Sequence, residues 1–393
     1  MNCFQIDLGA YMTKNPPFES IALLLQGGGA LGSYQAGVYE ALAEIDLHPN
    51  WVAGISIGAI NSALIAGNAP ENRVAALREF WELITTPSLI PSTLLTSLTS
   101  NYGGDDELVR GWINQMSALS TITHGAAGFF RPRALPPFLA QNSTKGALSF
   151  YDTKPLHETL ERLVDFDRIN DGHMRFSVGA VNVRTGNFEY FDSSTHTIDA
   201  RHVMASGSLP PGFPAVEIDG ESYWDGGVVS NTPLQWVLDS KPRQDTLAFQ
   251  VDLWSAVGDY PKDLTSQDVR LKDIRFSSRT RQNTDQFRKE QTLRRALAHL
   301  IEKLPENIKT EDNPEIQKLL AEADDKVYNI AHLIYRAKGY EGDSKDYEFS
   351  RASMEDHWKA GYEDTVKTLK HPEVLQRPTS PDGLNIFDLS DYR

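Results

Sequence analysis

Short apolar runs alternate with amphipathic segments in the first part of the chain. Residues 21–25 and 51–53 are apolar without interruption, which is typical of strands that are buried on both faces of a sheet. Each run leads through a turn into a segment with apolar residues at helical spacing, first over 34–45 and then over 59–66. A strand, a turn and a helix repeated in this order predict a parallel sheet with crossover helices.

The same alternation returns after residue 155. We expect a helix over 156–164, a strand over 176–181, a hairpin arm over 187–192 and a late strand over 246–252. These elements predict an α/β fold, namely a three-layer α/β/α sandwich around a mainly parallel central sheet.

Beyond about residue 255 the segments become longer and more charged. Apolar residues recur at helical spacing over 281–302 and over 314–337, so both stretches are expected to be helices. We therefore divide the chain into a lead-in over 1–19, an α/β domain over 20–255 and a helical region over 256–393.

Residues 88–150 interrupt the α/β pattern. They are rich in Ser, Thr, Gly and Pro, with apolar pairs at 89–90 and 94–95, and they predict a long irregular insertion. Two interpretations of its larger apolar residues stay open, a lid or acyl-chain wall on the one hand and packing into the core on the other. These residues are Phe129, Phe130, Leu135, Phe138 and Leu139.

Composition excludes several classes of protein. Of the 393 residues, 40% are hydrophobic, which is enough for a sizeable core and rules out wholesale disorder. The formal net charge of −15 argues against a nucleic-acid partner, because attraction to phosphates needs a positive surface.

The compartment is predicted from the cysteine and the N-terminus. Cys3 is the single cysteine, so no internal disulfide forms, which fits a reducing compartment. The first residues resemble no signal peptide, and no stretch reaches the ~18 apolar residues of a spanning helix. We expect a cytoplasmic protein, with any membrane contact peripheral at the inner surface.

A basic segment between Lys272 and Arg295 offers one candidate for such contact. Its Lys and Arg residues outnumber its acidic ones, so it could meet anionic headgroups, although a merely solvated helix face is the more common situation.

The first candidate site is a glycine loop after the 21–25 strand. It satisfies the pattern G-x-G-x-x-G, which admits a dinucleotide site, an oxyanion site or a turn without ligand. A dinucleotide site needs an acidic residue at the end of the second strand, and this chain has none there. The residues of the loop are Gly27, Gly28, Gly29, Ala30, Leu31 and Gly32.

A serine elbow follows the second strand. Gly54, Ile55, Ser56, Ile57 and Gly58 form G-x-S-x-G between a predicted strand and a predicted helix, the context in which this motif exposes a nucleophilic serine. The sharp turn excludes bulky neighbours, and the helix N-terminus favours developing negative charge. The alternative is a serine that only caps a helix.

A serine nucleophile needs a base in the transition state. Asp225 is followed by Gly226 and Gly227, which leave room for its carboxylate to approach another backbone, although Asp-Gly is also an ordinary turn. Four histidines after Asp225 are alternative bases, of which two lie in helical patterns. They are His299, His332, His357 and His371.

Together these three motifs resemble those of the patatin-like phospholipases, in the same order and at compatible separations. Residues 205–214, upstream of Asp225, also resemble that family, and the resemblance covers residues 20–255. Residues 350–362 resemble a helical extension found on a bacterial subset of the family. One departure is Leu31, where the family often carries arginine.

The resemblance implies a Ser–Asp dyad without a catalytic histidine. Ser56 would be the nucleophile and Asp225 the general base, with backbone amides of residues 27–30 as the oxyanion hole. The expected activity is hydrolysis of lipid acyl esters, of the phospholipase A or lysophospholipase type, through an acyl-enzyme.

Two other functions stay open at this stage. One is a soluble carboxylesterase or thioesterase that acts on shorter acyl groups, and the other is a lipid-binding module without catalysis. We expect no cofactor and no metal, because no His/Cys cluster has ligand spacing. The expected partner is a lipid or acyl ester, and oligomeric state is left open.

Overall fold

The computed structural model of the protein describes residues 16–86, 106–142, 144–277, 280–309 and 313–389. Three features singled out in the sequence lie outside these residues. They are Cys3 and the apolar pairs at 89–90 and 94–95.

Nine strands form one sheet, and β3 and β4 form a separate two-stranded ribbon. The strands are β1 (Ser20–Leu25), β2 (Trp51–Gly54), β3 (Arg131–Pro132), β4 (Tyr151–Asp152), β5 (Arg175–Asn182), β6 (Phe188–Asp192), β7 (Val216–Ile218), β8 (Glu221–Asp225), β9 (Thr246–Asp252), β10 (Tyr328–Ile334) and β11 (Leu384–Asp388).

The helices of the described residues cover this sheet and extend beyond it. They are α1 (Ser33–Glu44), α2 (Ile57–Ala66), α3 (Arg73–Ile84), α5 (Asp106–His124), α6 (Lys154–Leu163), α7 (Phe166–Asn170), α8 (Ala200–Ser206), α9 (Leu234–Asp239), α10 (Leu264–Phe276), α11 (Thr280–Glu302), α12 (Glu306–Lys309), α13 (Pro314–Glu322) and α14 (Arg351–Leu369).

The sheet is mainly parallel, as the alternation of strands and helices predicts. Its order is β11-β10-β9-β1-β2-β5-β8-β7, with β6 on the other edge of β5. The pairs from β11 to β5 are parallel, and the pairs of β5 with β6 and β8 and of β7 with β8 are antiparallel. β1 is apolar after Ser20, as expected for a strand with helices on both of its faces.

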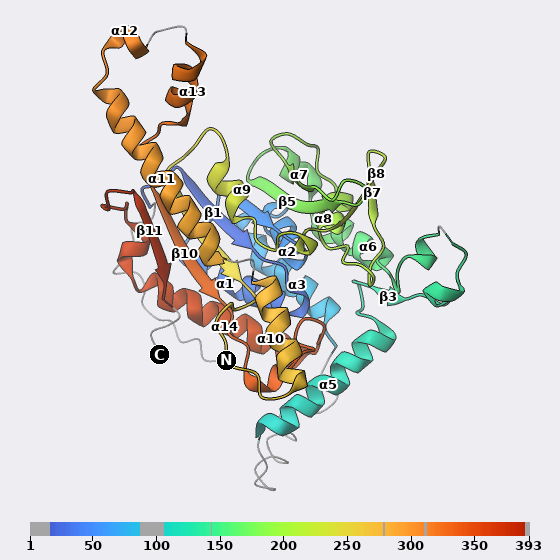
Figure 1. The fold of residues 1–393 in the computed structure, drawn as a ribbon. Coiled ribbons are helices and arrows are strands. Elements are labelled where there is room, and N and C mark those ends of the chain that lie inside the picture. Colours follow the sequence, from blue (N-terminus) through green and yellow to red (C-terminus); the bar gives the residue numbers. More distant parts are fainter. Residues whose placement is uncertain (1–15, 87–105, 143, 278–279, 310–312, 390–393) are drawn as a thin grey trace.

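The two faces of the sheet bury different helices (Figure 1). One face packs Leu23 and Leu25 against a core that includes α1, α2, α3 and α14. The other face packs Ala22 and Leu24 against side chains of α9 and α11, among them Phe287. The three-layer α/β/α prediction is therefore confirmed.

The prediction of one helix over 314–337 is wrong. The helix α13 ends at Glu322, and Tyr328–Ile334 is the strand β10, which pairs with β9 and β11. The apolar residues of 327–334 satisfied a helical period by coincidence. They form a short, almost continuous run, and such a run is ambiguous between a buried helix and a buried strand.

The prediction of an irregular stretch over 88–150 is wrong in the middle of that stretch. Within the described residues, Asp106–His124 forms the 19-residue helix α5. Its apolar positions are widely spaced among Ser, Thr and Asn, and this composition concealed the helical period.

The sheet also runs across the boundary placed near residue 255. β10 and β11 come from the C-terminal region and extend the sheet beyond β9, so residues 256–393 contribute to the same core as residues 20–255. The division of the chain into separate domains stays a prediction from the sequence.

Candidate active site

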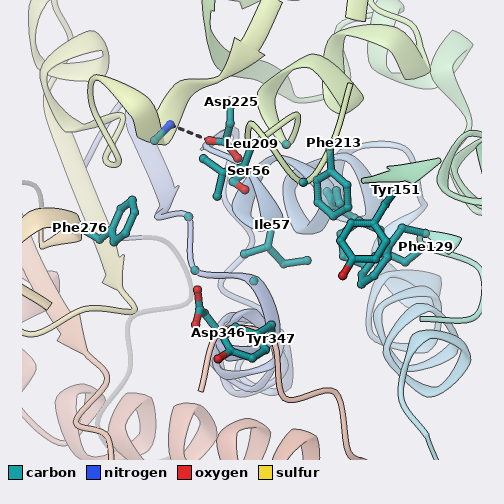
Figure 2. A pocket seen from close by; sticks show the side chains of 18 of the residues that line it. Ser56, Ile57, Phe129, Tyr151, Leu209, Phe213, Asp225, Phe276, Asp346 and Tyr347 are labelled. Atoms are coloured by element: carbon teal, nitrogen blue, oxygen red, sulfur yellow. Dashed lines mark hydrogen bonds between the residues drawn. The ribbon is translucent and has the colours of Figure 1, made fainter. Parts of the chain in front are cut away.

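The register of the sheet brings the serine elbow and the Asp-Gly-Gly motif together. β6 occupies one edge of β5, so β2 and β8 share the other edge, one beyond the other. Gly54 at the end of β2 lies opposite Val178, and Asp225 at the end of β8 lies opposite Ala180, two residues further along. Ser56 therefore leaves β2 directly beside Asp225 (Figure 2).

The elbow has the tight backbone that its glycines predict. Ser56 has φ +56°, a left-handed conformation that a non-glycine residue adopts only under constraint. A Cβ at Gly54 would lie 2.2 Å from the carbonyl oxygen of Gly58, and one at Gly58 would lie 2.2 Å from that of Leu25. Larger residues are excluded at both positions by this close approach.

Asp225 is buried, and its carboxylate accepts two hydrogen bonds. Its side chain accepts a hydrogen bond from the amide of Gly227 at 2.7 Å and one from the Ser56 side chain. Burial raises the pKa of Asp225 to about 7, and these two hydrogen bonds oppose the rise. The carboxylate is thus a much stronger base than an exposed aspartate.

The segment at the end of α8 forms hydrogen bonds with both the serine elbow and the Asp-Gly-Gly motif. The sequence analysis did not predict these contacts. The hydroxyl of Ser206 accepts a hydrogen bond from the amide of Ser56 at 3.0 Å and donates one to the carbonyl of Gly179 at 2.7 Å. Two residues on, the carbonyl of Ser208 accepts a hydrogen bond from the amide of Asp225 at 3.0 Å. The only signal in the sequence was that both serines lie in the 205–214 segment that resembles the family.

The glycine loop lies next to Ser56, but only part of it is free to bind an anion. The amide of Ala30 donates to the carbonyl of Asp346 at 2.8 Å, and that of Gly27 donates to the carbonyl of Asn231 at 3.4 Å. Within the described part of the chain, the amides of Gly28 and Gly29 have no such acceptor. Of the amides of residues 27–30 that were expected to form the oxyanion hole, those of Gly28 and Gly29 are therefore the ones left to donate. The side chain of Leu31 is buried.

A cavity of about 340 Å³ opens over Ser56 and Asp225. Part of its wall is aromatic, with Phe130 packed 4.9 Å from Tyr151 and 5.2 Å from Phe213 between ring centroids. Figure 2 shows Phe129, Tyr151 and Phe213 grouped on one side of the cavity. Phe129 and Phe130 are buried in the core and also line this cavity, so core packing is confirmed for them and a role as an acyl-chain wall stays a prediction. Leu135, Phe138 and Leu139 are exposed and belong to neither a wall nor the core.

The C-terminal region supplies part of the cavity wall opposite Ser56, and no motif in the sequence predicted this. Asp346 and Tyr347 line the cavity together with Phe276 and Phe349 (Figure 2). The Asp346 carboxylate pairs with Lys272 at 2.6 Å, and burial raises its pKa although Lys272 lowers it.

None of the four candidate histidines lies at the cavity, whose described lining contains no histidine. His332 is buried in β10, 3.9 Å from Asp252, and His357 is buried 3.3 Å from Glu341. His299 is exposed on α11, and His371 is exposed beyond α14. Of the five candidate bases, Asp225 is the one whose side chain contacts Ser56 and lines the cavity.

Two further searches concern metals and membranes. Over the residues that the structure describes, no group of three or more His, Cys, Asp or Glu side chains is placed to hold a metal ion. In the same residues, no helix combines the length and the apolar character needed to cross a bilayer.

Comparison with known families gives two matches. A model described as patatin-like phospholipase matches residues 23–238, and a model described as patatin phospholipase matches residues 274–381. The first includes all three motifs, and the second includes β10 and α14.

Individual relatives match a smaller part. An uncharacterized NTE family protein of Mycobacterium tuberculosis is 35% identical over 113 residues, which are 28% of this chain and 18% of the relative. The patatin-like phospholipase domain-containing protein 7 of Rattus norvegicus is 30% identical over 121 residues, 28% of this chain and 9% of the relative. The chain thus spans less than a fifth of the length of these curated relatives.

Among solved structures, VipD from Legionella pneumophila aligns with 95% of this chain and 72% of its own, at a TM-score of 0.40 and 15% identity. This likeness is too low to support a statement about function.

Proposed function

Because the chain belongs to the patatin-like phospholipase family, we propose that it hydrolyses acyl esters of lipids with Ser56 as nucleophile and Asp225 as general base. One observation carries the proposal. A buried carboxylate with a pKa raised to about 7 accepts a hydrogen bond from a serine side chain on a constrained elbow, at the floor of an apolar cavity.

The first half of the reaction forms an acyl-enzyme. The Ser56 Oγ attacks the ester carbonyl carbon while Asp225 accepts the hydroxyl proton. The developing oxyanion is stabilised by the amides of Gly28 and Gly29, each of which contributes ~3 kcal/mol when well aligned. Collapse of the intermediate breaks the ester bond, and Asp225 returns the proton to the leaving alcohol.

The second half regenerates the enzyme. Asp225 accepts a proton from water, whose oxygen attacks the acyl carbon, and the proton passes to the Ser56 oxygen as the free acid leaves. The raised pKa suits both halves, since a base works best when its pKa lies near the working pH.

The cavity favours an acyl chain as the bound group. Phe129, Phe130 and Phe213 present hydrocarbon to it, and its volume of about 340 Å³ falls within the range of small-molecule sites. We infer a long-chain ester rather than a short one, because each added methylene that is buried against the apolar wall makes the free energy of binding more favourable.

The test is covalent labelling with a fluorophosphonate probe. Wild type should be labelled, and Ser56→Ala should not. Asp225→Asn should be labelled at least ~100-fold more slowly, because the base is lost. Ser222→Ala is the matched control, since Ser222 is exposed on the same strand as Asp225 and touches no cavity atom.

Hydrolysis of p-nitrophenyl esters of increasing length then separates the candidate substrates. Rising kcat/KM with chain length, with a step where the ester forms micelles, supports lipid hydrolysis. A maximum at short chains would favour a soluble carboxylesterase instead. Labelling without turnover of any ester, or no labelling at all, would contradict the proposal.

A further inference from the structure

Most of the large exposed apolar side chains lie in the segments of the chain that line the catalytic cavity. Of the 20 large hydrophobic side chains exposed in the described residues, all but three lie in segments that also supply lining residues to that cavity. These segments are 106–124, 126–151, 207–213, 225–231 and 254–276. A soluble protein rarely concentrates apolar surface in this way unless the surface has a partner.

The helix α5 carries one part of this surface. Trp112, Met116, Leu119 and Ile122 are between 46% and 66% exposed, and their spacing places them along one face of the helix. The face leads to the cavity, because Ile122 is itself part of the lining. We call these four residues the α5 stripe.

The described residues of 125–150 form a lobe that carries a second part of this surface. In Figure 1 the lobe projects from the body of the molecule next to the end of α5, around the label β3. Phe138 is 79% exposed and Leu139 is 64% exposed, while Phe129 and Phe130 at the base of the lobe line the cavity.

The lobe also differs in charge from the rest of the chain. Residues 125–150 contain Arg131, Arg133 and Lys145 and no Asp or Glu, in a protein of formal net charge −15. Arg131 pairs with Asp152 at 2.9 Å, so the three positive charges and this one negative charge leave the lobe a net charge of +2. An apolar surface with local positive charge is the combination that binds anionic bilayers, and a second copy of this acidic chain offers no comparable attraction.

The basic segment between Lys272 and Arg295 is a weaker candidate for lipid contact. Lys272 pairs with Asp346 at 2.6 Å, and Arg294 lies 3.6 Å from Asp239. Arg295 donates to main-chain carbonyls, including that of Pro381 at 3.1 Å. These three charges already have partners within the fold, and the segment has more such partners than the lobe, where Arg131 alone among the described side chains forms an ion pair.

We propose that the lobe and the α5 stripe form the surface by which this protein docks on a bilayer containing anionic lipid. Phe138, Leu139 and Trp112 enter the interface, and an ester in the bilayer reaches Ser56 along the apolar path past Ile122. The use of the docked state for catalysis rests on the proposed function, whereas docking itself does not.

Docking is tested first without catalysis, in a Ser56→Ala background. The probes are vesicles of phosphatidylcholine, alone or with about 30% phosphatidylglycerol. The protein should pellet with the mixed vesicles, and less so at high salt or with phosphatidylcholine alone. Adding Phe138→Ser and Leu139→Ser should weaken binding about tenfold or more. Leu293→Ser with Leu300→Ser is the matched control, on exposed residues of α11 outside the cavity segments, and should bind as before.

Trp112 supplies a direct readout of the contact. It is the one exposed tryptophan among the seven of the chain. Its emission should shift to shorter wavelength on mixed vesicles, and Trp112→Phe should abolish the shift. No shift, equal pelleting by the control and lobe variants, or equal binding to both vesicle types would overturn the proposal. A lobe-dependent dimer in sedimentation, without vesicle binding, would do so as well.

Catalysis is tested separately with Ser56 intact. The lobe variant should hydrolyse a soluble short-chain ester at the wild-type rate and vesicle phospholipid at least about tenfold more slowly. Absence of all ester hydrolysis by wild type would refute the proposed function and leave the docking result standing. An unchanged vesicle rate in the lobe variant would refute the role of docking in catalysis.

Discussion

At the scale of the residue, the basicity of Asp225 comes from the unfavourable free energy of burying its charged carboxylate. Burial raises the pKa of this carboxyl from 3.8 to about 7, while the hydrogen bonds from Ser56 and Gly227 limit the rise. The same environment that makes the residue a useful base makes its charged form unfavourable in the folded protein.

The pH dependence of activity follows from this pKa. The base must be ionised, so kcat/KM for a soluble ester should fall as pH drops below about 7 and level off above it. Measurement of kcat/KM between pH 5 and 9 checks the profile. A plateau that extends down to about pH 5 would mean that a different group accepts the proton.

The pH dependence of stability has the opposite sign. A carboxyl with a higher pKa in the folded state than in the unfolded state destabilises the fold once pH exceeds the unfolded value, 3.8, with the full effect above about 7. Asp225→Asn should therefore raise the free energy of unfolding by roughly 2–4 kcal/mol at pH 8 and hardly at all near pH 4. Urea unfolding at both values measures the difference, and an equal change at both would contradict the assignment.

Ser206 is a positioning residue at this scale, since it acts through Ser56. Its hydroxyl holds the Ser56 amide at 3.0 Å. Ser206→Ala should lower kcat about tenfold with KM unchanged, because a displaced elbow misaligns the nucleophile without altering the cavity wall. Ser206→Cys retains a weak donor and should recover part of the rate. A rise in KM with normal kcat would indicate a role in substrate binding instead.

At the scale of the element, the helices α1 and α14 are the closest pair. A Cβ at Gly361 would lie 2.0 Å from the carbonyl oxygen of Tyr34, and one at Gly37 would lie 1.8 Å from that of Trp358. The two backbones thus touch, and α14 fixes the helix that follows the glycine loop.

Gly361→Val should destabilise the protein by roughly 2 kcal/mol or more, because the two helices must separate to admit the side chain. The midpoint of thermal unfolding measures this. Lys359→Ala, two residues away on the exposed side of α14, is the control and should shift the midpoint little. Equal midpoints for the two variants would show that the helices tolerate separation.

The elements also show where the sequence was informative. The strands β1, β2, β5 and β9 were predicted because uninterrupted apolar runs or flanking turns mark them. The strand β10 was mistaken for helix because Ile330, Leu333 and Ile334 fit the helical period, while a strand buried on both faces shows no alternation. The helix α5 was missed because much of its apolar face is exposed and interrupted by polar residues.

The site divides in the same way. Ser56 and Asp225 could be named as candidates because the small residues around them leave a local signature in the sequence. Ser206 and Asp346 left no such signature. The Ser206 hydroxyl accepts a hydrogen bond from the amide of Ser56, and the Asp346 carbonyl accepts one from the amide of Ala30. Both contacts depend on the packing of segments that are distant in the sequence.

At the scale of the whole molecule, the C-terminal region is part of the fold that holds the site. β10 pairs with β9 along seven residues, and Phe276, Asp346 and Tyr347 line the cavity. Removal of residues 256–393 exposes the edge of β9 and one face of α1.

A chain that ends at residue 255 should not fold on its own. We expect it to be insoluble or, if soluble, to be cut by trypsin at low concentration, because the exposed strand edge and apolar helix face have lost their cover. Limited proteolysis beside the full chain checks this. A protease-resistant fragment that retains fluorophosphonate labelling would show that residues 20–255 are autonomous.

The shared edge of β5 has a consequence for engineering. The meeting of Ser56 with Asp225 is set by the main-chain pairing of β2 with β5 and of β8 with β5, and no residue between 85 and 150 takes part in either pairing. A chimera that exchanges this stretch for one from another member of the family should keep its turnover of small esters. What such a graft would change is which lipid aggregates the enzyme attacks, so interfacial preference should be transferable as a module.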